Sequence, residues 1–443
     1  MVSSVTAVPM HSARHRSPKS RVFPWLVFAL TFALLLSDYM SRQVLSAVFP
    51  VLKAEWALTD ANLASLSSAV ALMVGILAVP LSLVADRWGR VRSLVLMVVI
   101  WSAATLMCAL ATSFHQMLLA RFIVGVGEAA YGSVGIAVVL SIFAPRVHAA
   151  LSGAFIAGGS FGSMVGVALG GLIAVHLGWR WAFAAMAIFG LILVTLFRAL
   201  VSEAKIARHA VGAGPVDSEC RVPSGGIRAP ISSLFTSSGV VCAYIGSGLQ
   251  IFCCAVLFAW LPSYFNRYHH LAADKAGAAA AMFVLLSGSG LIICGIITDR
   301  VGRSEASRKW DTAIVYCAIS LVCLSVGFRL GTGVVSLVLI GCGAFFCAGS
   351  SGPIAAMVAN LTHRSVHASA MGTLTLANNL LGLALGPLVV GMLADHIGLL
   401  KALQLAPVTY LAAIGVLLIG RRRYPDSARR LAALTESMAG TNR

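Results

Sequence analysis

Charged side chains are scarce in this chain of 443 residues: Asp, Glu, Lys and Arg make up 11% of it, and hydrophobic residues 59%. A soluble domain carries roughly a quarter charged residues, because its surface faces water. The polar residues here are too few to cover a globule of this size. Most of the surface must therefore face lipid, which excludes a soluble globular protein.

The chain also lacks the residue sets that enzymes and metal sites need. Of its ten cysteines only Cys220 lies outside the apolar runs, and there is no C-x-x-C pair. Free cysteine behaves as a small hydrophobe when it is buried, so we expect neither disulfide nor zinc chemistry. The stretch 158–162 matches G-x-S-x-G, but no strand-to-helix turn and no acid and histidine partners accompany it. We expect no enzyme, no metal and no cofactor.

Long apolar runs are what the sequence has in place of charge. A bilayer core requires roughly 20 apolar residues per helix. Runs of that length predict an all-α polytopic membrane protein with twelve transmembrane helices, at about 23–51, 63–85, 93–111, 116–143, 148–174, 180–201, 236–262, 276–298, 310–329, 333–360, 366–393 and 401–420.

The formal net charge of +17 comes from Lys and Arg in the short segments between runs and at both ends. They form no single stripe of the kind that binds nucleic acid, so we expect no nucleic-acid partner. With both termini placed in the cytoplasm, 24 of the 32 Lys and Arg fall on the cytoplasmic side and six outside. This asymmetry follows the positive-inside rule and predicts a cell-membrane protein (plasma or bacterial inner membrane) whose two termini are cytoplasmic.

A Gly-, Pro- and Ser-rich segment in the middle of the chain predicts a flexible connector between two six-helix halves. The predicted organisation is a tail at 1–22, an N-terminal bundle at 23–201, a linker at 202–235, a C-terminal bundle at 236–420 and a tail at 421–443. Two repeated sequence patterns relate the halves. The Asp-Arg-x-Gly-Arg pattern after the second span recurs after the eighth, 213 residues later, and Gly162, Gly166 and Gly171 recur in spacing as Gly382, Gly386 and Gly391.

These motifs resemble those of the major facilitator superfamily. The first nine positions of its loop signature G-x-x-x-D-R-x-G-R-[KR]-[KR] are met by 295–303. The segment from Ser82 to Arg92 follows the signature with Ser82 in place of glycine and Val91 within the basic run. Its fourth-span signature R-x-x-x-G-x-G-x-A is met from Arg121 to Ala129. The resemblance implies a secondary transporter that rocks two halves about a central site.

Within the superfamily the sequence is most similar to the Spinster-like branch, on the residues Asp38 to Gln43 and Gly125 to Tyr131. That branch implies an anionic amphiphile such as a lysophospholipid as substrate. It usually reads N-x-x-D-R in the first span, whereas this chain has Ser41 beside Arg42 and an acid one turn earlier, Asp38. Symporters of sugar acids and aromatic acids share much of the first-span pattern, which leaves a small organic anion as the alternative. We expect the carrier to act as a monomer.

Four ionisable residues lie deep in the predicted spans: Asp38, Arg42, Arg121 and Glu128. A charge at the centre of a span costs roughly 2.5–3.5 kcal/mol, so such residues are functional candidates. Counted at about 1.5 Å per residue, the two arginines lie at one depth and the two carboxylates at another. We expect one cluster facing a central cavity, in which Asp38 and Glu128 couple protons, driven by the proton gradient, and Arg42 and Arg121 bind the substrate. The alternative is a salt-bridge network that only neutralises itself.

The second half carries no deep charge, so a charged first half would face an apolar second half. With Tyr131 in the first half, its interior polar residues Gln250, Asn378 and Asn379 complete the predicted substrate-binding set. For the loop motifs we predict a gating role by pairing at the cytoplasmic side, although the positive-inside rule alone would also place the arginines there. The predicted gating residues are Asp86, Arg87, Gly89, Arg90, Asp299, Arg300, Gly302 and Arg303.

Overall fold

The computed structural model describes residues 19–144, 147–209, 235, 237–303, 305, 307–363 and 366–440. The first half consists of helices throughout the part described. They are α1 (Lys19–Trp56), α2 (Asp60–Trp88), α3 (Arg90–Leu110), α4 (Phe114–Glu128), α5 (Tyr131–Ile142), α6 (His148–His176), α7 (Trp179–Leu200) and the short α8 (Glu203–His209).

The second half is built in the same way. Its elements are α10 (Ser238–Tyr268), α11 (Ala273–Val301), α12 (Arg308–Gly327), α13 (Val334–Gly349), α14 (Ser351–Leu361), α15 (His367–Ala377), the π-helix η4 (Asn378–Ala384), α16 (Leu385–Ile397), α17 (Leu399–Leu405), the 3₁₀ turn η5 (Ala406–Val408) and α18 (Thr409–Gly440).

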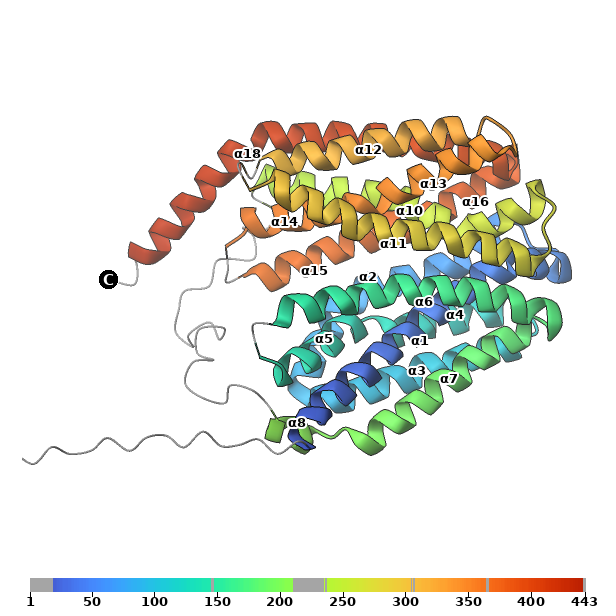
Figure 1. Cartoon of the computed structure of the whole chain (residues 1–443), viewed down its shortest axis with the longest axis horizontal. Coiled ribbons are helices and arrows are strands. Elements are labelled where there is room, and N and C mark those ends of the chain that lie inside the picture. Colours follow the sequence, from blue (N-terminus) through green and yellow to red (C-terminus); the bar gives the residue numbers. More distant parts are fainter. Residues whose placement is uncertain are drawn as a thin grey trace, which may run out of the picture.

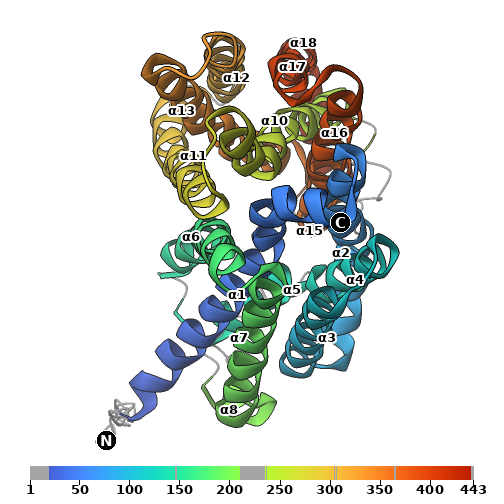
Figure 2. The same ribbon diagram turned by 90° about the vertical axis from the view of Figure 1, so that its right-hand side faces the viewer.

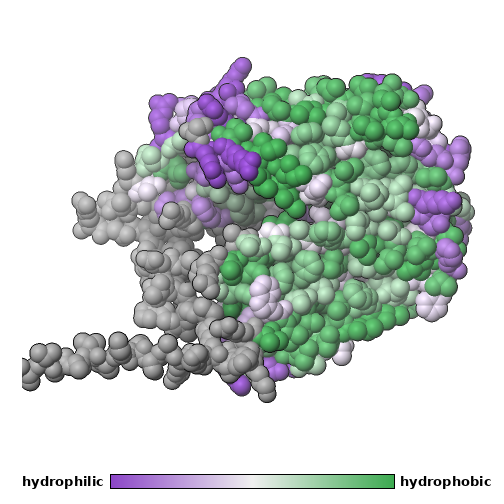
Figure 3. Space-filling view, viewed as in Figure 1, coloured by the Kyte–Doolittle hydropathy of each residue, from purple (hydrophilic) through white to green (hydrophobic). Residues whose placement is uncertain are grey.

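Within the described residues twelve helical segments are long and apolar enough to cross a membrane. The predicted span count and the all-α membrane fold are thus confirmed. Figure 3 shows apolar side chains around the middle of the molecule and hydrophilic ones at its two ends, which is the distribution expected of a protein with lipid as its solvent.

The helices gather into two groups. Figure 2 shows α1 to α7 on one side and α10 to α18 on the other, and Figure 1 shows α1 beginning and α18 leaving at the same end of the molecule. We call this end the terminal face and the opposite end the distal face. The groups meet along two lines of contact, where α6 packs on α11 and where α2 packs on η4 and α16.

Four of the predicted spans are interrupted, the twelfth by the 3₁₀ turn η5 between α17 and α18. The fourth breaks at Ala129 and Ala130 between α4 and α5, the tenth breaks at Ser350, and the eleventh contains the π-helix η4. In addition, α18 continues as a helix to Gly440, through the segment predicted as a tail, and projects beyond its neighbours in Figure 1. Arginine, alanine and leucine, which favour helix, make up 11 of the 20 residues at 421–440, and Pro425 lies within the helix.

The repeated glycines show how the two halves approach each other. An added Cβ at Gly166 would lie 2.7 Å from the Met40 carbonyl oxygen of the first span, and one at Gly386 would lie 2.7 Å from that of Phe252 in the seventh. The last glycine of each set instead faces the other half. A Cβ at Gly171 would lie 2.5 Å from the carbonyl oxygen of Ala273, and one at Gly391 would lie 2.7 Å from that of Asp60. Close helix contact through small residues is typical of membrane proteins, and here it seals the distal face on both lines of contact.

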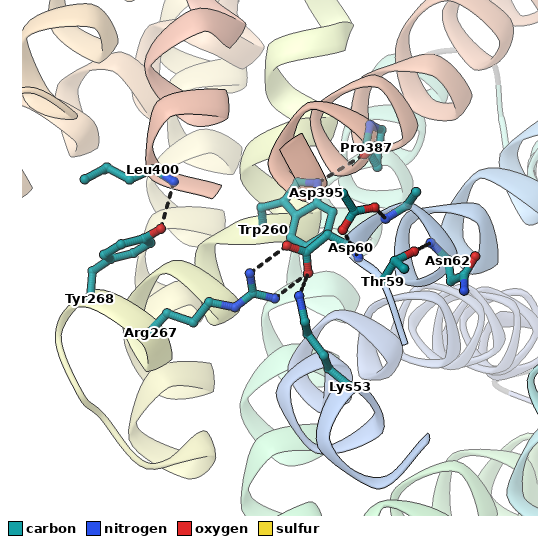
Figure 4. A network of polar contacts seen from close by, with 11 residues as sticks. Lys53, Thr59, Asp60, Asn62, Trp260, Arg267, Tyr268, Pro387, Asp395 and Leu400 are labelled. Atoms are coloured by element: carbon teal, nitrogen blue, oxygen red, sulfur yellow. Dashed lines mark hydrogen bonds and ion pairs between the residues drawn. The ribbon is translucent and has the colours of Figure 1, made fainter. Parts of the chain in front are cut away.

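An ion-pair network, which we call the distal lock, fastens the same end (Figure 4). Arg267 at the end of α10 donates from Nη1 to Asp60 Oδ2 at 2.8 Å and from Nη2 to Asp60 Oδ1 at 2.6 Å. Lys53 Nζ lies 2.6 Å from Asp60 Oδ1. From α16, Asp395 accepts the backbone N–H groups of Asp60 and Ala61 at 2.7 and 2.9 Å. Of the ion pairs between described residues, only Arg267–Asp60 joins the two halves.

The histidine pair that follows Arg267 does not compete for this network. His269 packs against the rings of Tyr264 and Phe265, with ring centroids 5.3 Å apart in both cases. Burial lowers the pKa of His269, and the neighbouring His270 lowers it further. Near pH 7 His269 is therefore neutral, and Asp60 is left with Lys53 and Arg267 as its cations.

Replacing Gly391 with alanine should destabilise the protein. The new Cβ would press on the backbone of Asp60, which cannot move aside like a flexible side chain, and such overpacking costs about 1–3 kcal/mol. We expect a melting temperature lowered by a few degrees in a thermal unfolding assay of the purified protein. Gly415→Ala is the matched control, because nothing lies within 4 Å of an added Cβ there; equal melting temperatures for the two variants would contradict the tight seal.

Removing the cation of the lock should loosen the distal face. Arg267→Gln deletes hydrogen bonds to a charged group, each worth about 1.5–3 kcal/mol, and leaves the halves without their ion pair. We expect amide hydrogen exchange in the first turn of α2 to accelerate by about tenfold or more, as measured by mass spectrometry. Arg180→Gln breaks a pair with Glu55 within one half and should leave that turn unchanged. Similar acceleration in both variants would show that the lock does not hold the halves together.

Candidate functional site

A cavity of about 630 Å³ runs from the middle of the molecule toward the terminal face. Its first-half wall comes from α1, α2 and the α4–α5 junction, and its second-half wall from α15 and η4. The lining includes Asp38, Tyr39, Arg42, Ser82, Asp86, Glu128, Ser133, Ser369, Thr375 and Asn379. Among the described residues the lock and the glycine contacts close the distal face, whereas the cavity extends toward the terminal face.

Three of the four deep charges meet at the inner end of this cavity. Arg42 Nε lies 2.7 Å from Glu128 Oε2 and 3.3 Å from Asp38 Oδ1. The Glu128 side chain is fully buried, the Asp38 side chain 4% exposed and the Arg42 side chain 20% exposed. One guanidinium nitrogen therefore bridges two carboxylates. Both remaining nitrogens of Arg42, Nη1 and Nη2, donate to no described protein atom.

Local helix geometry places Glu128 at this point. It is the last residue of α4, directly before the break that leads to α5. Gly127 lets α4 approach α3 closely, since a Cβ there would lie 2.6 Å from the Trp101 nitrogen. Ser41, which replaces the acid expected beside Arg42, contacts Glu128 Oε1 at 3.2 Å and donates to the Asp38 carbonyl oxygen at 2.8 Å. Sequence reasoning identified the missing acid but not this serine contact.

Arg121 has a different environment from Arg42. It is buried and donates to three backbone carbonyl oxygens, those of Leu66, Ser41 and Arg42, at 3.3–3.4 Å. It lines a second cavity of about 80 Å³ on the distal side of Arg42, together with Gln43, Ser46 and Ser67. Arg121 thus ties α1 to α2 and lies outside the larger cavity, and its predicted contact with substrate remains a prediction.

The other predicted substrate residues are divided between the cavity and the helix cores. Asn379 lines the cavity, donates to the Thr375 carbonyl oxygen at 2.9 Å and keeps its own side-chain oxygen without a partner among the described residues. Neighbouring Asn378 likewise has an unpartnered oxygen. Tyr131 donates instead to the Thr31 carbonyl oxygen at 2.8 Å inside the first half, and Gln250 bonds to Cys347 and Ser351 inside the second. In this conformation neither of the latter two lies on the cavity wall.

The second-half wall is not the apolar surface that the scarcity of charge predicted. It consists of Ser369, Met371, Gly372, Thr375, Asn379 and Leu383. The prediction failed because it counted charges over whole helices, whereas only one face of span 11 reaches the cavity. That face is largely small and polar.

The loop motifs lie at the terminal face and make no ion pair across the halves among the described residues. Asp86 pairs with Arg90 at 3.1 Å, and the exposed Asp299 lies 3.9 Å from Lys309. Gly89 adopts φ +110°, which favours glycine, and a Cβ there would lie 2.8 Å from Glu203 Oε1 of α8. Gly302 packs on the Lys309 side chain. Arg303 N donates to the Arg300 carbonyl oxygen at 3.4 Å, a bond within the loop. Between described residues, Arg87, Arg300 and Arg303 make no ion pair that would test a gating role. Their predicted gating role stays a prediction.

The distal lock is the functional element that sequence reasoning missed. Asp60, Arg267 and Asp395 stand at span ends, where charged residues are usual and attract no notice. Only the acid next to an N-cap, in the run Thr59–Asp60, distinguishes this position locally. Its partners lie 207 and 335 residues away, beyond the reach of any local pattern.

Comparison with known proteins places this arrangement in a family. The model of the Major Facilitator Superfamily matches residues 31–372 and, again, 240–437. The chain is 25% identical over 395 residues to a probable 4-methylmuconolactone transporter of Cupriavidus pinatubonensis, covering 87% of this chain and 88% of that one. It is 23% identical over 407 residues to a probable L-galactonate transporter of Escherichia coli, covering 88% and 87%.

A solved structure shares the fold over nearly the whole chain. It is a bacterial homologue of the human lysosomal transporter Spinster in an inward-facing, unoccupied conformation, with a TM-score of 0.80 at 17% identity, covering 93% of this chain and 99% of that one. The family match spans both halves, and the twelve helices and the central cavity agree with it. The chain is therefore a membrane transporter that belongs to the Major Facilitator Superfamily, and not an enzyme.

Proposed function

We propose that this transporter is a proton-coupled symporter of small organic anions, working by alternating access. The observation that carries the proposal is Arg42, whose Nε lies between two buried carboxylates while Nη1 and Nη2 face the cavity without a hydrogen-bond acceptor among the described residues. A guanidinium fork binds carboxylate in bidentate fashion. The relatives that are named as transporters of galactonate and methylmuconolactone support a small organic substrate.

Orientation belongs to the same proposal. The excess of Lys and Arg in the loops of the terminal face favours a cytoplasmic position for this face. The conformation described is then the inward-open one, with the distal lock as the closed outer gate. Outward opening would require Asp60 to give up Arg267 and the terminal face to close, where the loop motifs lie.

Coupling follows from the shared contact of Arg42. Bringing an anion to Nη1 and Nη2 adds a third negative group beside a guanidinium that already faces Asp38 and Glu128. Uptake of a proton by one of these acids relieves that excess, so anion and proton bind together. When the site faces the other compartment and the proton leaves, the anion loses part of its attraction and follows.

A lysophospholipid, the substrate implied by the Spinster-like resemblance, is the second candidate. Val79, Leu83 and Met371 give the wider part of the cavity apolar surface that an acyl chain could contact. The polar side chains of Ser82, Ser133 and Thr375 line the same cavity, and they favour the small anion. Both candidates place the anionic group at Arg42.

Purified protein in liposomes distinguishes these substrates. With an interior made more alkaline than the medium, we expect accumulation of galactonate or of an aromatic carboxylate, since inward proton flow drives symport. A lysophospholipid tested under the same gradient should move slowly or not at all. Transport of the lysophospholipid alone would favour the second candidate, and anion uptake that is indifferent to the gradient would refute proton coupling.

Glu128→Gln should separate coupling from binding. The amide keeps the shape of the side chain but cannot exchange a proton, so accumulation driven by the pH gradient should be abolished while exchange of labelled for unlabelled anion persists. Glu305→Gln, at an exposed glutamate near Arg308, is the control and should accumulate normally. An unfolded Glu128 variant would be recognised by loss of exchange and a lowered melting temperature; persistent gradient-driven accumulation would instead remove Glu128 from the coupling site.

A further inference from the structure

The buried site is electrically balanced. Within the described membrane interior, Asp38, Glu128 and Arg121 are buried and Arg42 is largely so. The other buried charged residue, Asp60, belongs to the distal lock, where it faces two cations of its own. Two carboxylates and two guanidinium groups sum to zero when all four are ionised. The empty carrier can therefore reorient without moving net charge through a low-dielectric interior.

The two arginines are not equivalent toward a ligand. Each nitrogen of Arg121 already donates one hydrogen bond to a backbone carbonyl group of α1 or α2, and Arg121 lines only the smaller of the two cavities. Among the described residues nothing accepts a hydrogen bond from Nη1 or Nη2 of Arg42, and this side chain reaches both cavities. The larger cavity thus offers one guanidinium fork without a protein partner among the described residues, enough to bind one anionic group in bidentate fashion.

The Ser41 hydroxyl can hydrogen-bond to Glu128 in both of its protonation states. Its hydroxyl oxygen lies 3.2 Å from Glu128 Oε1, and its hydrogen can stay on the Asp38 carbonyl oxygen at 2.8 Å. Since a hydroxyl both donates and accepts, it can donate to an ionised Glu128 and accept from a protonated one. An acid in the place of Ser41 would instead bring a fifth charge and a further site for a proton.

We propose that each cycle carries one proton on Glu128 together with one monovalent organic anion bound at Arg42, so that transport is electroneutral and the site discriminates against dianions. The inference rests on the proposed function and adds to it the stoichiometry and the charge of the substrate. The loaded site then carries the same net charge as the empty one. A phosphate dianion with one proton would leave the site at a net charge of minus one, which is costly at mid-membrane depth.

The membrane potential tests this directly in liposomes whose potential is set by a potassium gradient and valinomycin. The probes are glucuronate and glucose 6-phosphate, which are similar in size and differ in charge. Glucuronate uptake should follow the pH gradient and be unchanged by an inside-negative or inside-positive potential. Glucose 6-phosphate should enter more slowly by roughly tenfold or more, because its reorienting complex is charged.

Ser41→Asp gives the converse prediction, with Ser41→Asn as the neutral control of similar size. The aspartate makes the empty site negative, so reorientation moves charge or requires a second proton. We expect uptake by the aspartate variant to respond to membrane potential, and whatever uptake the asparagine variant retains to stay insensitive to it. If the aspartate variant fails to fold, the wild-type measurement still decides.

The outcomes separate the two levels of the proposal. Failure of every organic anion to move under a pH gradient would refute the proposed function. Gradient-driven uptake of glucuronate that also responds to potential, or equal rates for the two probes, would leave symport standing and overturn the single-proton, monovalent-anion cycle.

Discussion

The contact of Arg42 Nε with both Asp38 and Glu128 is the constraint around which the interior is arranged. A guanidinium cannot be discharged in a protein, so its burial requires compensating acids at short range. The break between α4 and α5 brings one acid to it, and a single helical turn of α1 supplies the other. Arg42 lines both cavities. Its side chain therefore separates the larger cavity, which extends toward the terminal face, from the smaller one on the distal side.

Lipid as a solvent explains why much of this could be predicted from the sequence. Each span must satisfy its own backbone, so the twelve apolar runs translate directly into helices. Each deep charge is costly, so the few that occur single out the site. The breaks at Ala129–Ala130 and Ser350 and the π-helix η4 carry no comparable signal, because alanine, serine and asparagine also occur in continuous helices.

Other features depended on partners that only the folded chain reveals. Tyr131 and Gln250 are polar residues within spans, as substrate ligands would be, yet each finds an acceptor inside its own half. The distal lock combines residues from both halves, and sequence alone does not state which end of one span faces which end of another. The repeated glycine spacing did indicate part of this interface, since Gly171 and Gly391, the last glycine of each set, lie where the halves touch.

One contact of the lock changes what the opening of the distal face involves. Asp395 caps α2 from the other half, accepting two of the four N–H groups that a helix start leaves without partners. When the halves separate there, these groups turn to water and the first turn of α2 can fray. Opening then includes local melting of a helix end, which adds chain entropy to the state that is open at the distal face.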